Sequence, residues 1–503
     1  MGIAALFKQT ALKLPDKVAI EFEDIRVTFK EIDTTGNKVA NALQSLGISK
    51  GDRVAQFLPN SLEIVYYLVG NFKNGSIVVP MNINFKEQEI HHILSDSGAK
   101  AIITDMERLP IVKNALNGLS ELKFIALVDG NEEGTYNSSE LIKNASDKEP
   151  NTVINDEDYA IIFYTSGTTG KPKGAALNQT NIMSNIKALE QAWKWTKDDI
   201  LLLTLPLYHI HGIGVALCGS LHIGNFTILK KKFVAEEVLE TIHKRKATLF
   251  MGVPTMYFKL LEIEGLEKYI LSSMRLFVSG SAPLSRDLFY RIKKAFGHEV
   301  LERAGMSESM MNFSNPYEGE RIPGSVGPCL PGIKIRIVDK NFNDVSVNSE
   351  GEILIKGPNV FTGYWNKSHY NKQVFKDGRF VTGDVGKIDE KGYVYIIGRS
   401  KDVIISGGIN IYPREIEDVI ESMPQVKECA VVGVPDKEFG ESVKAYVVLN
   451  PNSKSTEDEV IAYCKEKLAS FKKPKFVEFL EALPKNTMGK ILKEELRKMH
   501  KGR

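Results

Sequence analysis

Short apolar segments alternate with helical segments between residues 53 and 104, and this alternation restricts the fold more than any other feature of the chain. Strands that are joined by helices usually lie parallel in one sheet, so we expect an α/β fold. The same alternation returns later, with apolar runs near Leu201, Phe226, Thr248 and Arg275. The first stretch predicts strands at 53–59, 76–80 and 100–104 and helices at 61–73 and 85–95.

The N-terminal region predicts a β-hairpin followed by a helix. Residues 17–30 alternate apolar and polar side chains around a turn at Glu23 and Asp24. Thr28 and Glu31 have the spacing of a capping box, and Gly47 can end the helix that follows.

The pattern changes after about Pro323 to short strands separated by turns, which predicts an antiparallel β subdomain at 334–397. A small α+β region follows, with helices expected at 413–422 and 457–468 and strands at 426–434 and 442–449. A chain of 503 residues exceeds the size of one hydrophobic core. We therefore expect a large N-terminal domain at 1–398, a connection at 399–402 and a small mobile domain at 403–503.

Composition excludes several classes of protein. With 65 basic and 63 acidic residues, and no basic run paired with aromatic residues, nucleic acid is not expected as a partner. The four cysteines are far apart and form no Cys-x-x-Cys pair, which argues against both a disulfide framework and a zinc site. The N-terminus has neither the layout of a signal peptide nor a myristoylation motif. We expect a cytoplasmic protein.

Residues 200–229 contain no Asp, Glu, Lys or Arg, and this segment must be weighed as a membrane span. Proline, histidine, asparagine and glycine residues interrupt it. A buried strand, a loop and a helix therefore fit better than a span, and none is expected.

The segment 164–174, Tyr-Thr-Ser-Gly-Thr-Thr-Gly-Lys-Pro-Lys-Gly, has the composition of a phosphate-binding loop. An apolar run at 158–163 predicts a strand before it, and 177–193 predicts a helix after it. Glycines allow backbone N–H groups to approach an anion, and hydroxyl and lysine side chains add donors and positive charge. The glycine spacing does not match a Walker A loop. A flexible surface linker is the remaining alternative.

Further motifs follow in order: Leu-Pro-Leu-Tyr-His at 205–209, Ser-Gly-Ser-Ala-Pro at 279–283, Gly-Met-Ser-Glu at 305–308, Thr-Gly-Asp at 382–384, Gly-Arg-Ser-Lys-Asp at 398–402 and Pro-Lys-Asn-Thr-Met-Gly-Lys at 484–490. Together with the loop they resemble the adenylate-forming superfamily of acyl-CoA synthetases, luciferases and peptide-synthetase adenylation domains. The resemblance spans nearly the whole chain and implies the use of ATP, Mg²⁺ and coenzyme A.

The resemblance implies a role for each motif. Residues expected to bind the nucleotide are Thr165, Ser166, Gly167, Thr168, Thr169, Gly170, Lys173, Ser281, Ala282, Pro283, Asp384 and Arg399. Residues expected to act in catalysis are Lys490, Ser307 and Glu308, with Glu308 and Thr168 holding magnesium. Residues expected to bind the acid are His209, Arg303 and Ser279, with His211 structural. Lys401 is expected to be the hinge, and Ser406, Gly407 and Gly408 the coenzyme A loop.

Charged residues such as Lys490, Glu308 and Asp384 are, taken singly, more often solvated than functional. The chemistry nevertheless suits them, because attack on the α-phosphate of ATP gathers negative charge that donors, a divalent cation and a lysine can stabilise. A metal pair of His209 and His211 is weakly supported, since two ligands alone do not make a site.

Within the superfamily, the segments 301–308, 315–321 and 323–327 are most similar to the malonyl-CoA synthetase group. In that group the arginine that matches Arg303 pairs with the distal carboxylate of malonate. An internal ion pair between Arg303 and Glu302 is the alternative. Ala304 stands where the family usually has an adenine-stacking aromatic residue, and Ser307 replaces the usual threonine.

The expected activity is that of an AMP-forming acyl-CoA synthetase for malonate or methylmalonate. Three alternatives stay open at this point: a short- or medium-chain monocarboxylic acid ligase, an adenylation unit that feeds a carrier protein, and a nucleotide-sensing protein without activity. The sequence is compatible with a monomer or a homodimer.

Overall fold

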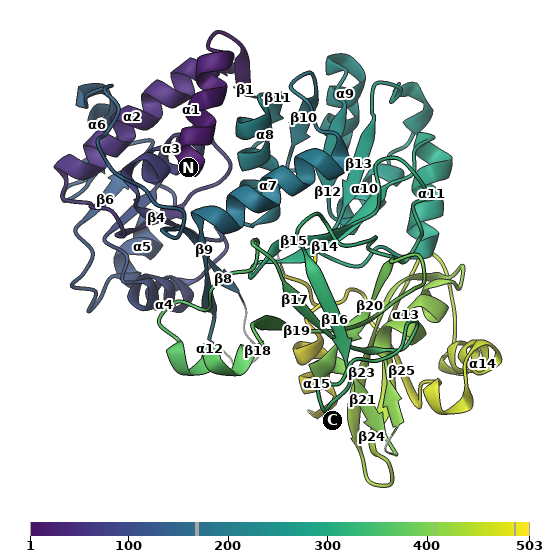
Figure 1. The fold of residues 1–503 in the computed structure, drawn as a ribbon. Coiled ribbons are helices and arrows are strands. Elements are labelled where there is room, and N and C mark those ends of the chain that lie inside the picture. The colour runs from purple at the N-terminus through teal and green to yellow at the C-terminus, as the bar shows by residue number, and fades with distance from the viewer. Residues whose placement is uncertain (1, 166–170, 408, 487–488, 502–503) are drawn as a thin grey trace.

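The computed structural model describes residues 2–165, 171–407, 409–486 and 489–501. Its N-terminal part contains two large sheets, which lie on either side of the long helix α7 (Gln179–Trp193) (Figure 1). The prediction of a mixed α/β architecture is confirmed, with largely parallel sheets in the N-terminal part and largely antiparallel sheets after residue 333.

The first sheet has seven strands in the order β7-β6-β5-β3-β4-β8-β9, and all neighbours are parallel except β8 and β9. Its strands are β3 (Arg53–Phe57), β4 (Ile77–Pro80), β5 (Ala101–Thr104), β6 (Phe124–Leu127), β7 (Tyr136–Asn137), β8 (Tyr159–Thr165) and β9 (Lys173–Asn178). Its helices are α2 (Phe29–Ser45), α3 (Leu62–Asn74), α4 (Glu87–Ser97), α5 (Leu109–Ala115) and α6 (Ser138–Asn144).

The second sheet has eight strands in the order β15-β14-β13-β12-β10-β11-β1-β2, and it is antiparallel only at its two edges. Its strands are β1 (Val18–Phe22), β2 (Ile25–Thr28), β10 (Ile200–Leu203), β11 (Phe226–Leu229), β12 (Leu249–Gly252), β13 (Leu276–Ser279), β14 (Leu301–Met306) and β15 (Met310–Ser314). The helices of this part are α1 (Ile3–Lys13), α8 (Cys218–Ile223), α9 (Ala235–Arg245), α10 (Pro254–Leu261) and α11 (Arg286–Phe296), with a short 3₁₀ turn at Leu266–Lys268.

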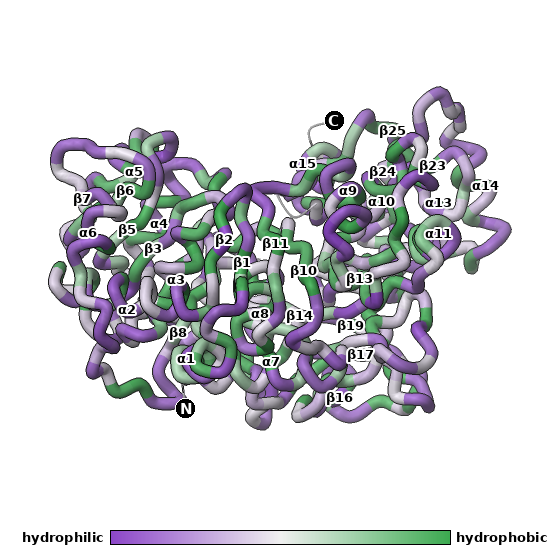
Figure 2. The backbone as a smooth tube through the Cα atoms, turned by 90° about the horizontal axis from the view of Figure 1, so that it is seen from above, coloured by the Kyte–Doolittle hydropathy of each residue, from purple (hydrophilic) through white to green (hydrophobic). Residues whose placement is uncertain are grey.

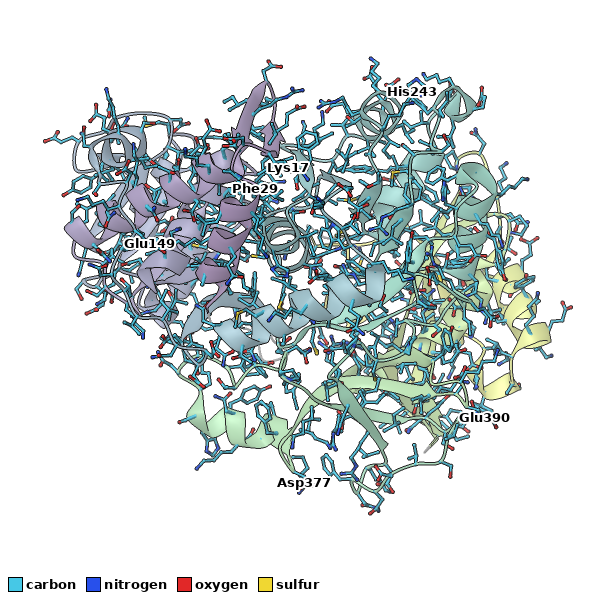
Figure 3. The ribbon with its side chains drawn as sticks, turned by 45° about the horizontal axis from the view of Figure 1, so that its top comes forward. Lys17, Phe29, Glu149, His243, Asp377 and Glu390 are labelled. Atoms are coloured by element: carbon cyan, nitrogen blue, oxygen red, sulfur yellow. The ribbon has the colours of Figure 1, made fainter. Side chains whose placement is uncertain are left out.

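The predicted N-terminal hairpin and capping box are both present. Thr28 and Glu31 bond each other's backbone N–H groups at the start of α2. The N–H of Phe29 donates to the carbonyl of Lys17 at 3.1 Å, which ties the start of the helix to the foot of the hairpin (Figure 3).

Two largely antiparallel sheets form the remainder of the chain. The third sheet contains β16 (Lys334–Val338), β17 (Gly351–Lys356), β18 (Phe375–Lys376), β19 (Arg379–Ile388) and β20 (Val394–Arg399), with α12 (Ser368–Val374) beside it. The fourth contains β21 (Ile404–Ser406), β22 (Ile409–Ile411), β23 (Val426–Asp436), β24 (Gly440–Leu449) and β25 (Phe476–Phe479). Its helices are α13 (Pro413–Glu421), α14 (Glu457–Lys467) and α15 (Lys493–Lys501), with 3₁₀ turns at Ser400–Asp402 and Ser470–Lys472.

The prediction of a strand, a loop and then a helix around residue 170 is wrong in one respect. The loop is followed by β9, which pairs antiparallel with β8, and α7 begins only at Gln179. The candidate phosphate loop therefore connects the two strands of a hairpin.

The uncharged segment 200–229 forms β10, a π-helix at His211–Leu217, α8 and β11, as a buried strand, loop and helix would require. Within the described residues, no helix has both the length and the apolar character needed to cross a bilayer. Hydrophobic residues concentrate in the strands, whereas the peripheral loops are hydrophilic (Figure 2). The largest core joins residues of both N-terminal sheets with Ile182, Ile186 and Trp193 of α7.

Candidate functional site

The base of the candidate phosphate loop is firmly built. Tyr164 pairs with Gly174 and Thr165 with Lys173 in the last rungs of the hairpin. A side chain at Gly174 would lie 2.6 Å from Ile162, so glycine permits the close packing there. Among the predicted loop residues, Ser166, Gly167, Thr168, Thr169 and Gly170 lie outside the described residues.

Lys173 lies in the electrostatic field of Glu308, a second predicted site residue. Burial lowers the pKa of Lys173, the charge of Lys367 lowers it further, and the carboxylate of Glu308 opposes both. Its ammonium also lies 4.6 Å from the ring centre of Tyr370. The structure thus brings Lys173 and Glu308 to one place although 135 residues separate them (308 minus 173).

Glu308 and Ser307 occupy the turn between β14 and β15. Glu308 is 7% exposed, and its Oε1 accepts a hydrogen bond of 2.8 Å from the hydroxyl of Tyr364. Burial and the adjacent Glu308 raise the pKa of Tyr364 well above its usual value, so this hydroxyl stays a donor. No motif marked Tyr364, whose contact depends on packing between distant segments.

A single carboxylate oxygen site of this kind fits Mg²⁺ that takes most of its ligands from phosphate and water. Within the part of the chain that the structure describes, no group of three or more His, Cys, Asp or Glu side chains could hold a metal ion alone. Thr168, the other predicted magnesium ligand, lies outside the described residues.

Arg303 lies on β14 and is 2% exposed, yet its Nε and Nη2 atoms have no hydrogen-bond partner among the described residues. Burial lowers the pKa of its guanidinium to about 9, so it is charged at neutral pH. A side chain at Gly280 would lie 2.6 Å from the guanidinium carbon of Arg303, so glycine is needed for the guanidinium to lie this close to the backbone.

The alternative of an internal pair between Arg303 and Glu302 is wrong. Successive residues of a strand point to opposite faces of the sheet. The Oε1 atom of Glu302 instead accepts from the backbone N–H of Leu284 at 3.1 Å, and its Oε2 atom is unpaired. Burial raises the pKa of Glu302 to about 7.

Two histidines add further polar atoms to the surroundings of Arg303. Burial lowers the pKa of His209 to about 4, and burial with the charge of Arg303 lowers the pKa of His211 well below its usual value, so both rings are neutral at pH 7. Their Nε2 atoms have no partner, and neither has the buried hydroxyl of Ser279 at the end of β13. These atoms can bind a polar ligand.

His211, which we expected to be structural, lies in this site. Its Nδ1 is 3.3 Å from the hydroxyl of Ser281, a predicted nucleotide residue. Ser281 has a φ of 70°, so the turn that begins there is strained for a residue with a side chain. Ala282 and Pro283 continue this turn, which connects β13 to α11.

Asp384 and Arg399 lie opposite each other on β19 and β20. The Nε of Arg399 is 2.8 Å from Oδ1 of Asp384, and its Nη1 donates to the carbonyl of Thr382 at 3.0 Å. Burial raises the pKa of Asp384, whereas the positive charges of Arg399 and Lys490 lower it. Lys490 therefore lies close enough to Asp384 to affect its ionisation.

Lys490 comes from the C-terminal part of the chain. Gly489, its neighbour, packs against Thr255 of α10, where an added side chain would lie 2.9 Å from the hydroxyl oxygen. Desolvation lowers the pKa of Lys490, and Arg399 lowers it further, while Asp384 raises it. The structure thus brings Lys490, Asp384 and Arg399 together.

The remaining predicted residues belong to the connection and the fourth sheet. Lys401 lies in the 3₁₀ turn Ser400–Asp402, directly after β20. Ser406 pairs with Gly440, and the N–H of Gly407 donates to the carbonyl of Phe439 at 2.8 Å. These contacts lie within the small C-terminal sheet, and Gly408 lies outside the described residues.

Comparison with known proteins agrees with this arrangement. Residues 7–365 match the model of the AMP-binding enzyme family, and residues 415–490 match the C-terminal domain of AMP-binding enzymes. A long-chain-fatty-acid–CoA ligase of Bacillus subtilis is 35% identical over 98% of this chain and 94% of its own length. A malonate–CoA ligase of Arabidopsis thaliana is 33% identical over 94% of this chain and 82% of its own.

Solved structures give a closer likeness. The crystal structure of ATP-bound MatB from Rhodopseudomonas palustris is 39% identical, covers 100% of this chain and 99% of its own, and has a TM-score of 0.94. The apo structure of the same protein has a TM-score of 0.83 at the same identity and coverage. The arrangement of this chain is therefore closer to that of the ATP-bound protein. By the extent of these matches, the chain belongs to the AMP-binding enzyme family, part of the adenylate-forming superfamily.

Proposed function

We propose that this enzyme is an AMP-forming acid–CoA ligase whose acid is a short dicarboxylate, either malonate or methylmalonate. The observation that carries the choice of acid is the buried, unpaired guanidinium of Arg303. A buried charge without a partner is costly, and the forked donors of arginine match a carboxylate. A distal carboxylate of the substrate supplies the missing counter-charge.

The coarser activity is common to the relatives: the chain is an acid–thiol ligase that uses ATP, Mg²⁺ and coenzyme A. Sequence identity does not select the acid, because the fatty-acid and malonate ligases are 35% and 33% identical to the chain. The polar groups around Arg303 are the better guide.

In the first half reaction, a carboxylate oxygen bonds to the α-phosphorus of ATP and the bond from that phosphorus to pyrophosphate breaks. Lys490 and the hydroxyl of Ser307 stabilise the charge that develops on the α-phosphate. Lys173 binds the phosphates, and the carboxylate of Asp384 accepts hydrogen bonds from the ribose. Magnesium held at Glu308 and Thr168 would offset phosphate charge.

In the second half reaction, the thiol of coenzyme A bonds to the acyl carbon and AMP leaves. We infer that the small domain turns about residues 399–402, with Lys401 as the hinge. This movement would withdraw Lys490 from the α-phosphate and bring Ser406, Gly407 and Gly408 towards the thiol.

The experiment that tests the acid is pyrophosphate release with malonate, butyrate and octanoate at matched concentrations. A site built for a polar group rejects analogues that lack it by about 10⁴-fold, so malonate should exceed both monocarboxylates by that order. Equal or higher kcat/KM with octanoate would reject the dicarboxylate and leave a medium-chain ligase. Repeated turnover that free coenzyme A does not stimulate would instead argue against coenzyme A as the acceptor and favour a carrier protein.

A further inference from the structure

One face of helix α4 contacts both ends of the candidate phosphate loop. His92 and Asp96 are four residues apart on α4, so their side chains lie on the same side of the helix. Neither residue belongs to a motif that the sequence revealed.

Asp96 contacts the start of the loop. Its Oδ2 accepts a hydrogen bond of 2.9 Å from the hydroxyl of Tyr164, the next-to-last residue of β8. Its Oδ1 accepts from Nζ of Lys367 at 2.5 Å, immediately before α12. Burial and the charge of Asp96 raise the pKa of Tyr164 well above its usual value, so the hydroxyl keeps its proton.

His92 contacts the end of the loop. Its Nε2 is 2.9 Å from the carbonyl oxygen of Pro172, one residue before β9. A carbonyl oxygen only accepts hydrogen bonds, so Nε2 of His92 carries the proton and donates the hydrogen bond. The ring of His92 also meets the ring of Tyr164 edge to face, with centroids 6.3 Å apart.

The segment 364–367 lies along β9, the second strand of the hairpin. The N–H of Trp365 donates to the carbonyl of Gly174 at 2.8 Å, and Tyr364 forms a bridge with Ala175. Tyr364 is also the residue that donates to Glu308. The loop ends, the predicted magnesium ligand and α4 are therefore connected through direct contacts.

We propose that His92 and Asp96 are positioning residues for the adenylation step, which hold the two ends of the phosphate loop at a fixed separation. The proposal rests on the phosphates of ATP lying at this loop, and it is independent of the identity of the acid. Holding Tyr164 and Pro172 in place before ATP arrives leaves less ordering to be done on binding.

The test compares His92→Phe with His92→Gln. Phenylalanine keeps the ring contact with Tyr164 but cannot donate to Pro172, whereas the amide of glutamine can donate. We expect His92→Phe to raise KM for ATP by roughly 3- to 10-fold, the range that one neutral hydrogen bond provides. KM for malonate should change less than about 2-fold by the same reasoning, and His92→Gln should restore most of the ATP value.

A matched control is His91→Phe. His91 is the neighbouring residue on α4, but its Nδ1 lies 2.9 Å from the carbonyl of Ala115, away from the loop. This variant should leave both KM values unchanged. A rise in KM for ATP in His91→Phe, or an equal rise in the KM values for ATP and malonate in His92→Phe, would show general loosening of the domain and overturn the proposal.

Tyr164→Phe and Asp96→Ala complete the test. If Asp96 acts on the loop through Tyr164, the double variant with Tyr164→Phe and Asp96→Ala should raise KM for ATP no more than Asp96→Ala alone. Independent effects of the two substitutions would add. Additive effects, or an unchanged KM for ATP in Tyr164→Phe, contradict the proposal. Lys173→Ala separates failure of the positioning role from failure of phosphate binding by the loop. If this variant leaves KM for ATP unchanged, the loop does not bind phosphate and the positioning role fails with it.

Discussion

Arg275 lies immediately before β13 and Arg303 lies within the neighbouring strand β14, and of the two only Arg275 has a counter-charge. Its Nε and Nη2 atoms each donate to Asp199 at 2.6 Å, and its Nη1 donates to the carbonyl of Trp193 at 3.0 Å. Burial alone would lower the pKa of Arg275, but Asp199 raises it overall. Arg303, with two unpaired nitrogens, has a lowered pKa.

The difference separates a structural arginine from a binding arginine. A buried pair with all its hydrogen bonds satisfied needs nothing further from a ligand. Arg303 lies one residue beyond the point where β14 pairs with Ser279, the last residue of the parallel strand β13, and α/β sheets bind their ligands beyond such carboxyl ends. The charge of Arg303 is stabilised when an anion arrives. The two sites can therefore be distinguished by what each loses on substitution.

Arg303→Met should give the largest effect. We expect kcat/KM for malonate to fall by about 10³- to 10⁴-fold, because the distal carboxylate loses its partner in a buried site. The melting temperature should stay the same or rise, since a buried unpaired charge is replaced by an apolar side chain. Kinetics with malonate and butyrate measure kcat/KM, and thermal unfolding measures the melting temperature. A lower melting temperature with unchanged kinetics would make Arg303 structural.

Arg275→Met should show the opposite behaviour. Removing one partner of a buried pair leaves Asp199 uncompensated, and we expect a loss of about 3 kcal/mol in the free energy of unfolding. This is the lower end of the usual range, because the Arg275 side chain is 22% exposed. Urea unfolding measures the loss. The kcat/KM of the folded fraction should match wild type, and a selective loss of malonate activity would contradict the comparison.

Acid should slightly reduce the contribution of the Arg275–Asp199 pair to the free energy of unfolding. This is the smallest expected effect. Burial raises the pKa of Asp199, but hydrogen bonds from Arg275, Thr196 and Thr248 lower it overall. A carboxyl whose folded pKa is below its unfolded value, about 3.9, stabilises the protein above that pH and loses this contribution as the pH falls. Urea unfolding at about pH 5 and pH 3.5 should show a smaller loss in Asp199→Asn than in wild type, with a difference of at most about 0.7 kcal/mol, the limit that an unfolded pKa of about 3.9 sets over this interval. Equal losses in the two proteins would show that the Asp199 carboxylate contributes nothing.

The sequence predicted the repeated strands and helices well because their signals are local. The strands predicted at 76–80 and 100–104 form at Ile77–Pro80 and Ala101–Thr104, and the capping box at Thr28 forms as its spacing requires. Strand β9 was missed because Lys-Gly-Ala-Ala-Leu-Asn has little intrinsic preference for a strand. It forms because β8 supplies an antiparallel partner.

The site shows the same division. Motifs placed Glu308, Arg303, Asp384 and Lys490 in the order of a known family, but not the contacts among them. The hydroxyl of Tyr364 reaches Glu308 from 56 residues away, and His211 reaches Ser281 from 70 residues away. Such contacts depend on how separate sheets pack, and no local pattern encodes them.

Arg399 both contacts Asp384 and ends the strand that leads into the small domain. It is the last residue of β20, and its guanidinium is held by Asp384 and Thr382, while the next three residues form the turn into the small domain. If the small domain turns about residues 399–402 as we propose, the start of that connection is anchored to Asp384, a residue that we propose binds the ribose. Loss of the ribose contact would then loosen the residue from which the connection to the small domain begins.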